Sequence, residues 1–154
     1  ILKWVQELSP GGKILYKILC GRNEKLYSYV KSLHHPLIEA IPYLHSKAEM
    51  NRLYEQATGI MTKPGGVTIS ECLQKRLPVF IYHALPGQEE MNLNLLHERK
   101  LVTDMRNWDM KKAEEYIAAF FQSNEQMKEY KKHVNGYLGE MSDRKIEDIL
   151  KRIL

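Results

Sequence analysis

Short apolar runs alternate with longer amphipathic segments along the whole chain. The runs have the length of buried strands, and the longer segments repeat apolar residues at every third or fourth position, as helices do. Five strands are expected, at residues 13–20, 37–41, 59–62, 78–82 and 101–103. Strands that alternate with helices are typical of a parallel sheet with crossover helices. The pattern therefore predicts an α/β fold, with a parallel sheet flanked by helices.

Capping residues mark where several helices should begin. Ser46 with Glu49 forms a capping box, Ser123 with Gln126 forms a second one, and Ser142 can cap the last helix. Helices are expected at residues 1–8, 24–33, 46–57, 67–76, 88–99, 109–122, 124–138 and 143–153. The last three make a helical carboxyl-terminal segment.

The composition is that of one globular domain. The 154 residues are 44% hydrophobic and 27% charged, and no apolar run is long enough to span a bilayer. The formal net charge of +4 favours anionic partners. Cys20 and Cys72 lack the spacing of a zinc site or a disulfide framework, which suits a reducing cytoplasm. Because Ile1 follows neither a methionine nor a signal-peptide pattern, the chain is expected to be a fragment.

A glycine turn follows the third expected strand. Pro64-Gly65-Gly66 leads into a helix, so unpaired backbone N–H groups and the positive end of a helix dipole come to the carboxyl edge of the sheet. Phosphate binds well in such a place. Thr68 stands in the first turn, and Glu71 on the same helix face can accept hydrogen bonds from two ribose hydroxyls. The alternative is an ordinary turn followed by a solvated glutamate.

A second polar cluster follows the fourth expected strand. Gln88, Glu89 and Asn92 stand at the start of a helix, directly after Pro86-Gly87. Carboxylate and amide groups suit sugar hydroxyls, which both donate and accept hydrogen bonds. An acidic first turn that complements the helix dipole would need no ligand. The position at the same sheet edge as the glycine turn favours a binding site.

Together these segments resemble a known family. Residues 61–71 (Met-Thr-Lys-Pro-Gly-Gly-Val-Thr-Ile-Ser-Glu), then Leu77-Pro78-Val79 and Pro86-Gly87-Gln88-Glu89, are similar to the donor-binding domain of diacylglycerol glycosyltransferases. These are the monogalactosyldiacylglycerol synthases and the processive diacylglycerol glucosyltransferases. The similarity extends from Cys20-Gly21-Arg22-Asn23 to the closing helices, whereas Gln74-Lys75-Arg76 departs from the family pattern. The chain resembles, more loosely, the N-acetylglucosaminyltransferase of peptidoglycan-precursor synthesis.

The resemblance implies one half of a GT-B fold, in which two Rossmann-like domains face a cleft. Residues 1–154 would form the carboxyl-terminal domain, which binds the UDP-sugar donor. The amino-terminal domain, which receives the lipid and supplies the catalytic base, would be missing. The donor domain would also lack its own first strand and glycine-rich loop. No catalytic residue is therefore expected in this chain.

The donor-binding residues that the resemblance implies are Gly65, Gly66, Thr68, Glu71, Gln88, Glu89, Asn92, Tyr43 and Leu44. The glycines and the threonine would meet the diphosphate, and the glutamate of the same helix would meet the ribose hydroxyls. The Gln-Glu pair would meet the hexose, with the asparagine nearby. The Tyr-Leu loop would lie against uracil.

The implied activity is inverting transfer of a hexose from UDP-glucose or UDP-galactose to diacylglycerol. Neither a cofactor nor a metal is implied, and the chain has no Asp-x-Asp metal motif. N–H dipoles at Gly66 would stabilise the negative charge that develops on the leaving UDP. The complete enzyme would work in the cytoplasm, peripherally at the inner face of the cell membrane.

Several alternatives stay open. A transferase that uses UDP-N-acetylglucosamine, a UDP-sugar 2-epimerase and a catalytically silent UDP-sugar-binding module are each compatible with a diphosphate turn. Nucleic acid is not expected as a partner, because Lys and Arg are spread along the chain without a recognition motif. The six histidines form no catalytic or ligand constellation. The basic amphipathic helix at 143–153 is expected to pack against the domain, with contact to a membrane surface as the alternative.

Overall fold

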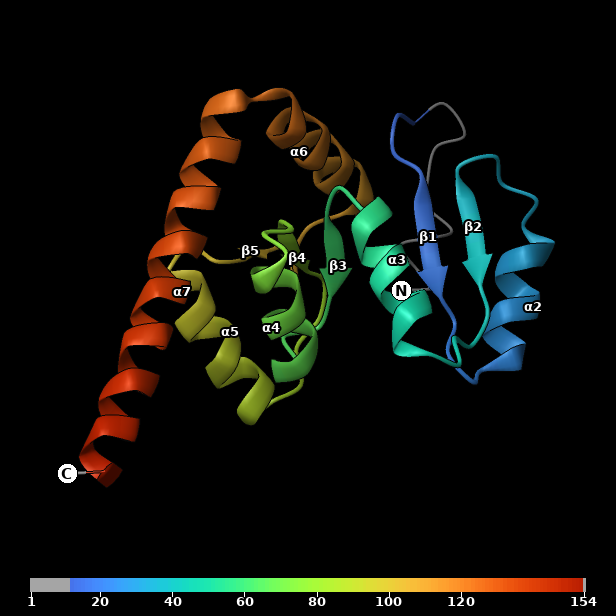
Figure 1. The fold of residues 1–154 in the computed structure, drawn as a ribbon. Helices are drawn as coiled ribbons and strands as arrows, with labels where there is room; N and C mark the ends of the chain where they lie inside the picture. Colours follow the sequence, from blue (N-terminus) through green and yellow to red (C-terminus); the bar gives the residue numbers. More distant parts are fainter. Residues whose placement is uncertain (1–11, 154) are drawn as a thin grey trace. The chain divides into compact units, whose positions relative to one another are not determined.

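A computed structural model describes residues 12–153 of the chain, with side chains described through residue 143 (Figure 1). The strands are β1 Tyr16–Leu19, β2 Ile38–Ile41, β3 Ile60–Thr62, β4 Val79–Ile81 and β5 Thr103–Asp104. The helices are α2 Glu24–Ser32, α3 Lys47–Gln56, α4 Gly66–Gln74, α5 Gln88–Glu98, α6 Met110–Gln122 and α7 Asn124–Ile153. The helix predicted at residues 1–8 lies outside the described residues. Strands and helices alternate as the sequence predicted, which confirms the Rossmann-like α/β class.

The described chain divides into two compact units. The first unit comprises the described residues up to Gln56 together with Trp108–Ala119. The second unit comprises Ala57–Asn107 and the chain from Phe120 onward. Strands β1 and β2 pair in parallel in the first unit, and the second unit holds a parallel sheet of order β3-β4-β5. Each unit is therefore built on parallel strands joined by helices.

The three strands of the second unit end in one row. Thr62 of β3 pairs with Ile81 of β4, and Ile81 pairs with Asp104 of β5. The ladder continues past the strand ends, because the Tyr82 N–H donates to the Thr62 carbonyl at 3.3 Å and the Met105 N–H donates to the Ile81 carbonyl at 2.9 Å. The loops that leave β3, β4 and β5 consequently start side by side at the carboxyl edge of this sheet.

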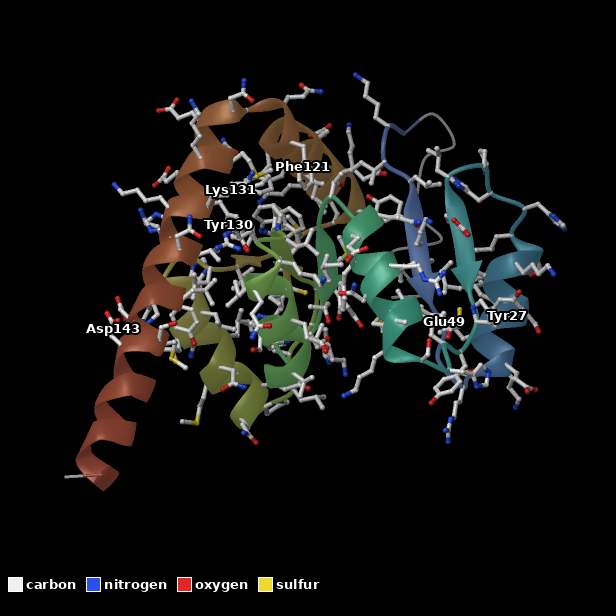
Figure 2. All side chains as sticks on the ribbon, viewed as in Figure 1. Tyr27, Glu49, Phe121, Tyr130, Lys131 and Asp143 are labelled. Carbon is white, nitrogen blue, oxygen red and sulfur yellow. The ribbon has the colours of Figure 1, made fainter. Side chains whose placement is uncertain are left out.

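Strand β4 is the centre of the second unit's core. Val79, Phe80 and Ile81 are at most 3% exposed, as expected for a middle strand covered on both faces. The Phe80 ring makes edge contacts with the rings of Phe120 and Phe121 near the end of α6. Phe121 is labelled in Figure 2. A continuous apolar run in the sequence therefore becomes a strand with no solvent-facing side.

The predicted helix starts are largely confirmed. Glu49 accepts hydrogen bonds from the Ser46 N–H and hydroxyl, while the Ser46 hydroxyl accepts the Glu49 N–H, which is a complete capping box. The Gln126 N–H donates to the Ser123 hydroxyl at 3.2 Å, so Ser123 caps α7. The predicted strand at 13–20 is shorter than expected, since β1 covers only Tyr16–Leu19.

The carboxyl-terminal segment differs from the prediction. Helices were expected at 124–138 and 143–153, but α7 is a single helix over Asn124–Ile153, drawn in orange to red in Figure 1. Ser142 does not cap a new helix: its hydroxyl donates to the Leu138 carbonyl four residues back, which is a bond of a helix interior. No helix in the described part of the chain, α7 included, is long and apolar enough to cross a membrane.

A buried tyrosine joins α7 to the loop before β4. The Tyr130 hydroxyl donates to the Leu77 carbonyl at 2.8 Å, and both residues are at most 9% exposed (Figure 2). We expect Tyr130→Phe to lower the free energy of unfolding by about 1–2 kcal/mol, because the Leu77 carbonyl stays buried without a donor. Urea unfolding followed by circular dichroism measures the change. Tyr137→Phe, on the same helix and half-buried, is the matched control; an equal loss in both variants would contradict this account.

Candidate functional site

The glycine turn leaves the start of α4 open. Pro64 is fully buried, and the Gly65 N–H donates to the Lys63 carbonyl at 2.8 Å, which makes a tight turn after β3. Gly65 is the N-cap of α4, and the first helical bond runs from the Ile69 N–H to the Gly65 carbonyl. The N–H groups of residues 66–68 therefore have no acceptor within the helix and carry the positive end of its dipole. This arrangement suits a phosphate group.

The two glycines of this turn are not explained by the chain's own packing. A Cβ atom added at Gly65 or Gly66 would meet no atom of the described residues within 4 Å, and neither glycine has a positive φ. Gly59 is different, because a Cβ there would lie 2.9 Å from the Phe121 ring and 3.1 Å from the Phe80 ring. Gly59 is needed for packing, whereas Gly65 and Gly66 leave free space beside the open helix start.

Thr68 and Glu71 lie on α4 as the sequence predicted. Thr68 is half-buried in the first turn, and Glu71 is exposed one turn later, on the same face of the helix. The next residue, Cys72, is fully buried. Burial, and to a smaller extent the Glu71 carboxylate, raise the pKa of the Cys72 thiol to about 12. Cys72 is thus a packing residue, and Glu71 beside it is an exposed polar group of α4.

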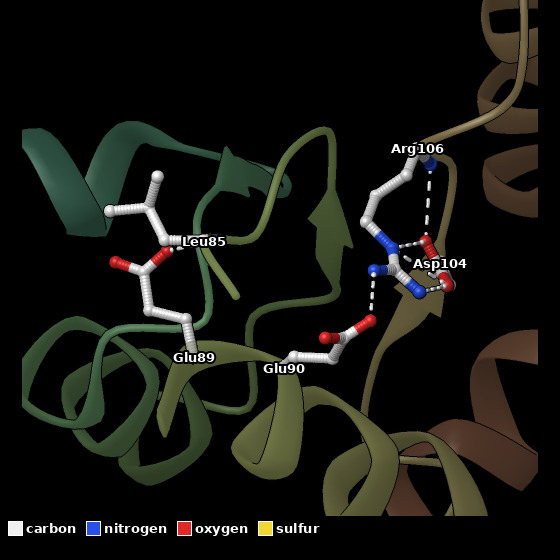
Figure 3. Close-up of polar contacts among 5 residues, drawn as sticks. All are labelled: Leu85, Glu89, Glu90, Asp104 and Arg106. Carbon is white, nitrogen blue, oxygen red and sulfur yellow. Dashed lines mark hydrogen bonds and ion pairs between the residues drawn. The ribbon is translucent and has the colours of Figure 1, made fainter. Parts of the chain in front are cut away.

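The second cluster begins with a glycine that its backbone requires. Gly87 caps α5 with φ +96°, a conformation that side chains rarely allow. Gln88 opens the helix and is exposed, while the Glu89 carboxylate turns back and accepts the Leu85 N–H at 2.7 Å (Figure 3). Burial and the Glu89 carboxylate raise the pKa of Tyr82 at the end of β4. Glu89 therefore holds its own loop in place, a role that the sequence did not reveal.

A side-chain contact joins the two clusters. The Asn92 amide on α5 donates to the Pro64 carbonyl in the glycine turn at 3.4 Å. The sequence placed Asn92 near the hexose only by resemblance and had no means to detect this contact. The expectation that both clusters share a sheet edge agrees with the row formed by the ends of β3 and β4. Their roles in donor binding stay predictions.

A charged cluster beside α5 was not anticipated. The Arg106 guanidinium donates to both carboxylate oxygens of Asp104, at distances between 3.0 and 3.2 Å, and lies 3.6 Å from a Glu90 oxygen (Figure 3). Burial raises the pKa of Asp104, but the hydrogen bonds and charge of Arg106 outweigh it and lower the pKa overall. Asp104 is therefore ionised at neutral pH. Pairs of opposite charge sixteen residues apart leave no signal in a periodic pattern.

Tyr43 and Leu44 belong to the first unit, where they follow β2. Tyr43 is 40% exposed; the Arg22 guanidinium lies 4.7 Å from its ring centre and donates to its hydroxyl at 3.3 Å. The His45 ring meets the Tyr43 ring edge-on at 5.0 Å. Tyr43 is thus an exposed aromatic residue whose ring contacts Arg22 and His45. Its contact with uracil stays a prediction.

Comparison with known proteins gives several related sequences, although no family model matches the chain. The chain is 97% identical, over all of its 154 residues, to an uncharacterized glycosyltransferase of Bacillus subtilis strain 168, YkoN. It is 25% identical over 98% of its length to the processive diacylglycerol β-glucosyltransferase of the same strain. A processive diacylglycerol β-glucosyltransferase of Bacillus cereus strain B4264 is 34% identical over 83 residues, which are 54% of the chain.

The chain spans 41% and 40% of the length of the two Bacillus subtilis relatives and matches 21% of the Bacillus cereus one. The matches to the two Bacillus subtilis relatives extend over at least 98% of the chain. The chain is thus similar along its whole length to a glycosyltransferase and distantly homologous to the processive diacylglycerol β-glucosyltransferases, which agrees with the resemblance found in the glycine turn and the Pro-Gly-Gln-Glu segment.

Proposed function

We propose that this chain binds a UDP-hexose donor, and that the whole protein transfers the hexose to diacylglycerol with inversion at the anomeric carbon. The observation that carries the proposal is the contact between Asn92 and the Pro64 carbonyl. It brings the Gln88-Glu89 start of α5 next to the open start of α4. One surface thus offers N–H groups for a diphosphate beside amide and carboxylate groups for a sugar.

The chemistry of the two helix starts supports a nucleotide sugar. A diphosphate needs hydrogen-bond donors and positive potential, which the N–H groups of residues 66–68 supply without a metal ion. As the bond to the anomeric carbon breaks, negative charge grows on the diphosphate oxygens. Fixed dipoles that already point at those oxygens stabilise this charge without reorganisation. The free space at Gly65 and Gly66 suits a ligand that approaches the backbone closely.

The acceptor and the sugar are inferred from the relatives. Two of them are named as diacylglycerol β-glucosyltransferases, which favours a diacylglycerol acceptor and glucose as the hexose. A lipid acceptor would place the complete enzyme at a membrane surface, in agreement with the peripheral location expected from the sequence. Galactose remains the alternative that donor titration distinguishes from glucose.

Titration of the chain with nucleotides tests the donor site. We expect the chain to bind UDP and UDP-glucose, with ADP as the control nucleotide that binds far more weakly. Glu71→Ala should weaken UDP binding by about ten- to a hundredfold, because a carboxylate that accepts hydrogen bonds contributes roughly 1.5–3 kcal/mol. Isothermal titration calorimetry measures the dissociation constants, and UDP-galactose ranks the two hexoses. Equal binding of UDP and ADP by a folded chain would contradict a uridine-specific site.

A glycine substitution separates binding from stability. Alanine is the better helix former, so Gly66→Ala at the start of α4 should raise the free energy of unfolding by about 0.5–1 kcal/mol or leave it unchanged. The same methyl group should weaken UDP binding, since it occupies the space beside the open N–H groups. Gly136→Ala in α7, where a Cβ also meets no described atom within 4 Å, is the matched control, and its binding should be unaltered. Wild-type affinity in Gly66→Ala would show that no ligand approaches this turn.

A further inference from the structure

Two adjacent carboxylates at the start of α5 project to opposite sides. Glu89 points back to the loop, where it accepts the Leu85 N–H, and Glu90 points toward Arg106 (Figure 3). The first turn of α5 is therefore held from two directions by consecutive residues. The same turn carries Gln88, and the next turn carries Asn92, the two amides of the proposed donor site.

Arg106 is itself fixed to the sheet. Its guanidinium forms a fork on the Asp104 carboxylate, and its backbone N–H donates to the same carboxylate at 3.1 Å. Asp104 pairs with Ile81 in the buried centre of the sheet, and Met105, between the two charged residues, is fully buried. Arg106 thus stands on a rigid support, whereas most of the loop that precedes α5 is exposed.

The start of α5 depends on such a support. Gly87, its N-cap, has no side chain to accept a hydrogen bond from the first turn, and Pro86 and Gly87 are both exposed. We propose, on the basis of the proposed function, that Arg106 is a positioning residue, which holds the first turn of α5 so that Gln88 and Asn92 meet the hexose of the donor. Arg106 does not touch the donor itself; it acts through Glu90.

The test compares two arginines: Arg106, which contacts the first turn of α5, and Arg99, which is its C-cap. Arg99 at the C-cap pairs with Glu140 at 2.9 Å, and its side chain is 35% exposed against 28% for Arg106, so Arg99→Met is a matched control. Dissociation constants for UDP and for UDP-glucose are measured for Arg106→Met, Arg106→Lys and Arg99→Met. For each variant, the ratio of the two dissociation constants gives the contribution of the hexose to binding, because UDP lacks the hexose. Hydrogen exchange of residues 85–92 reports the order of the first turn without any ligand.

We expect Arg106→Met to weaken UDP-glucose binding on the order of tenfold while UDP binding stays within about twofold, since a small displacement of contact groups loses affinity. Exchange at 85–92 should become faster. Arg106→Lys, which keeps the charge but not the fork, should recover part of both effects. Arg99→Met should leave the ratio and the exchange at 85–92 at wild-type values.

Three results would overturn the assignment of Arg106. These are unchanged exchange at 85–92 in Arg106→Met, an equal loss of UDP and UDP-glucose affinity, and the same loss of the hexose contribution in Arg99→Met. A wild-type chain that binds neither nucleotide would overturn the proposed function and, with it, the link to the hexose. In that case the exchange experiment still decides whether Arg106 orders the first turn of α5, so the two failures are distinguishable.

Discussion

The parallel pairing of β4 with its two neighbours is the constraint on which the candidate site depends. Val79, Phe80 and Ile81 are buried on both faces, so the strand has no freedom to shift its register without exposing apolar surface. Through Ile81 the ends of β3 and β5 are brought into the same row. The glycine turn, the Pro-Gly-Gln-Glu loop and the Arg106 cluster leave from this row, which is why segments far apart in the sequence meet.

The sequence predicted what depends on local patterns and on the two motifs. Strand β4, the Ser46–Glu49 capping box and the position of Glu71 on α4 follow from apolar runs, cap chemistry and helical spacing. It was wrong about α7, because Ser142 can cap a helix or bond to a carbonyl inside one, and the residue type alone does not distinguish the two. The pair of Glu90 with Arg106 depends on strand register, which no local pattern contains.

The glycines of the second unit differ in whether the fold requires a glycine at their positions. Gly59 is required because two aromatic rings fill the space beside it, and Gly87 is required because its φ is +96°. At Gly65 and Gly66 neither reason holds. Gly136 in α7 has equally free space, so what distinguishes Gly65 and Gly66 is their position at the start of α4. A helix start of this kind suits an anion that comes close to the backbone, which supports the diphosphate of the proposed donor.

The ion pair between Glu90 and Arg106 contributes little to the free energy of folding, so stability does not explain its presence. An exposed ion pair such as the one between Glu90 and Arg106 contributes at most about 1 kcal/mol to folding, so it adds little to the stability of the unit. The ion pair has a larger effect on geometry, because the Arg106 guanidinium is also bonded to Asp104. Asp104 lies in β5, which pairs with the buried strand β4. As proposed above, this contact on a rigid support holds the first turn of α5 in one orientation. In the proposed donor site this orientation matters, because each sugar hydroxyl must meet a donor or an acceptor at hydrogen-bond distance.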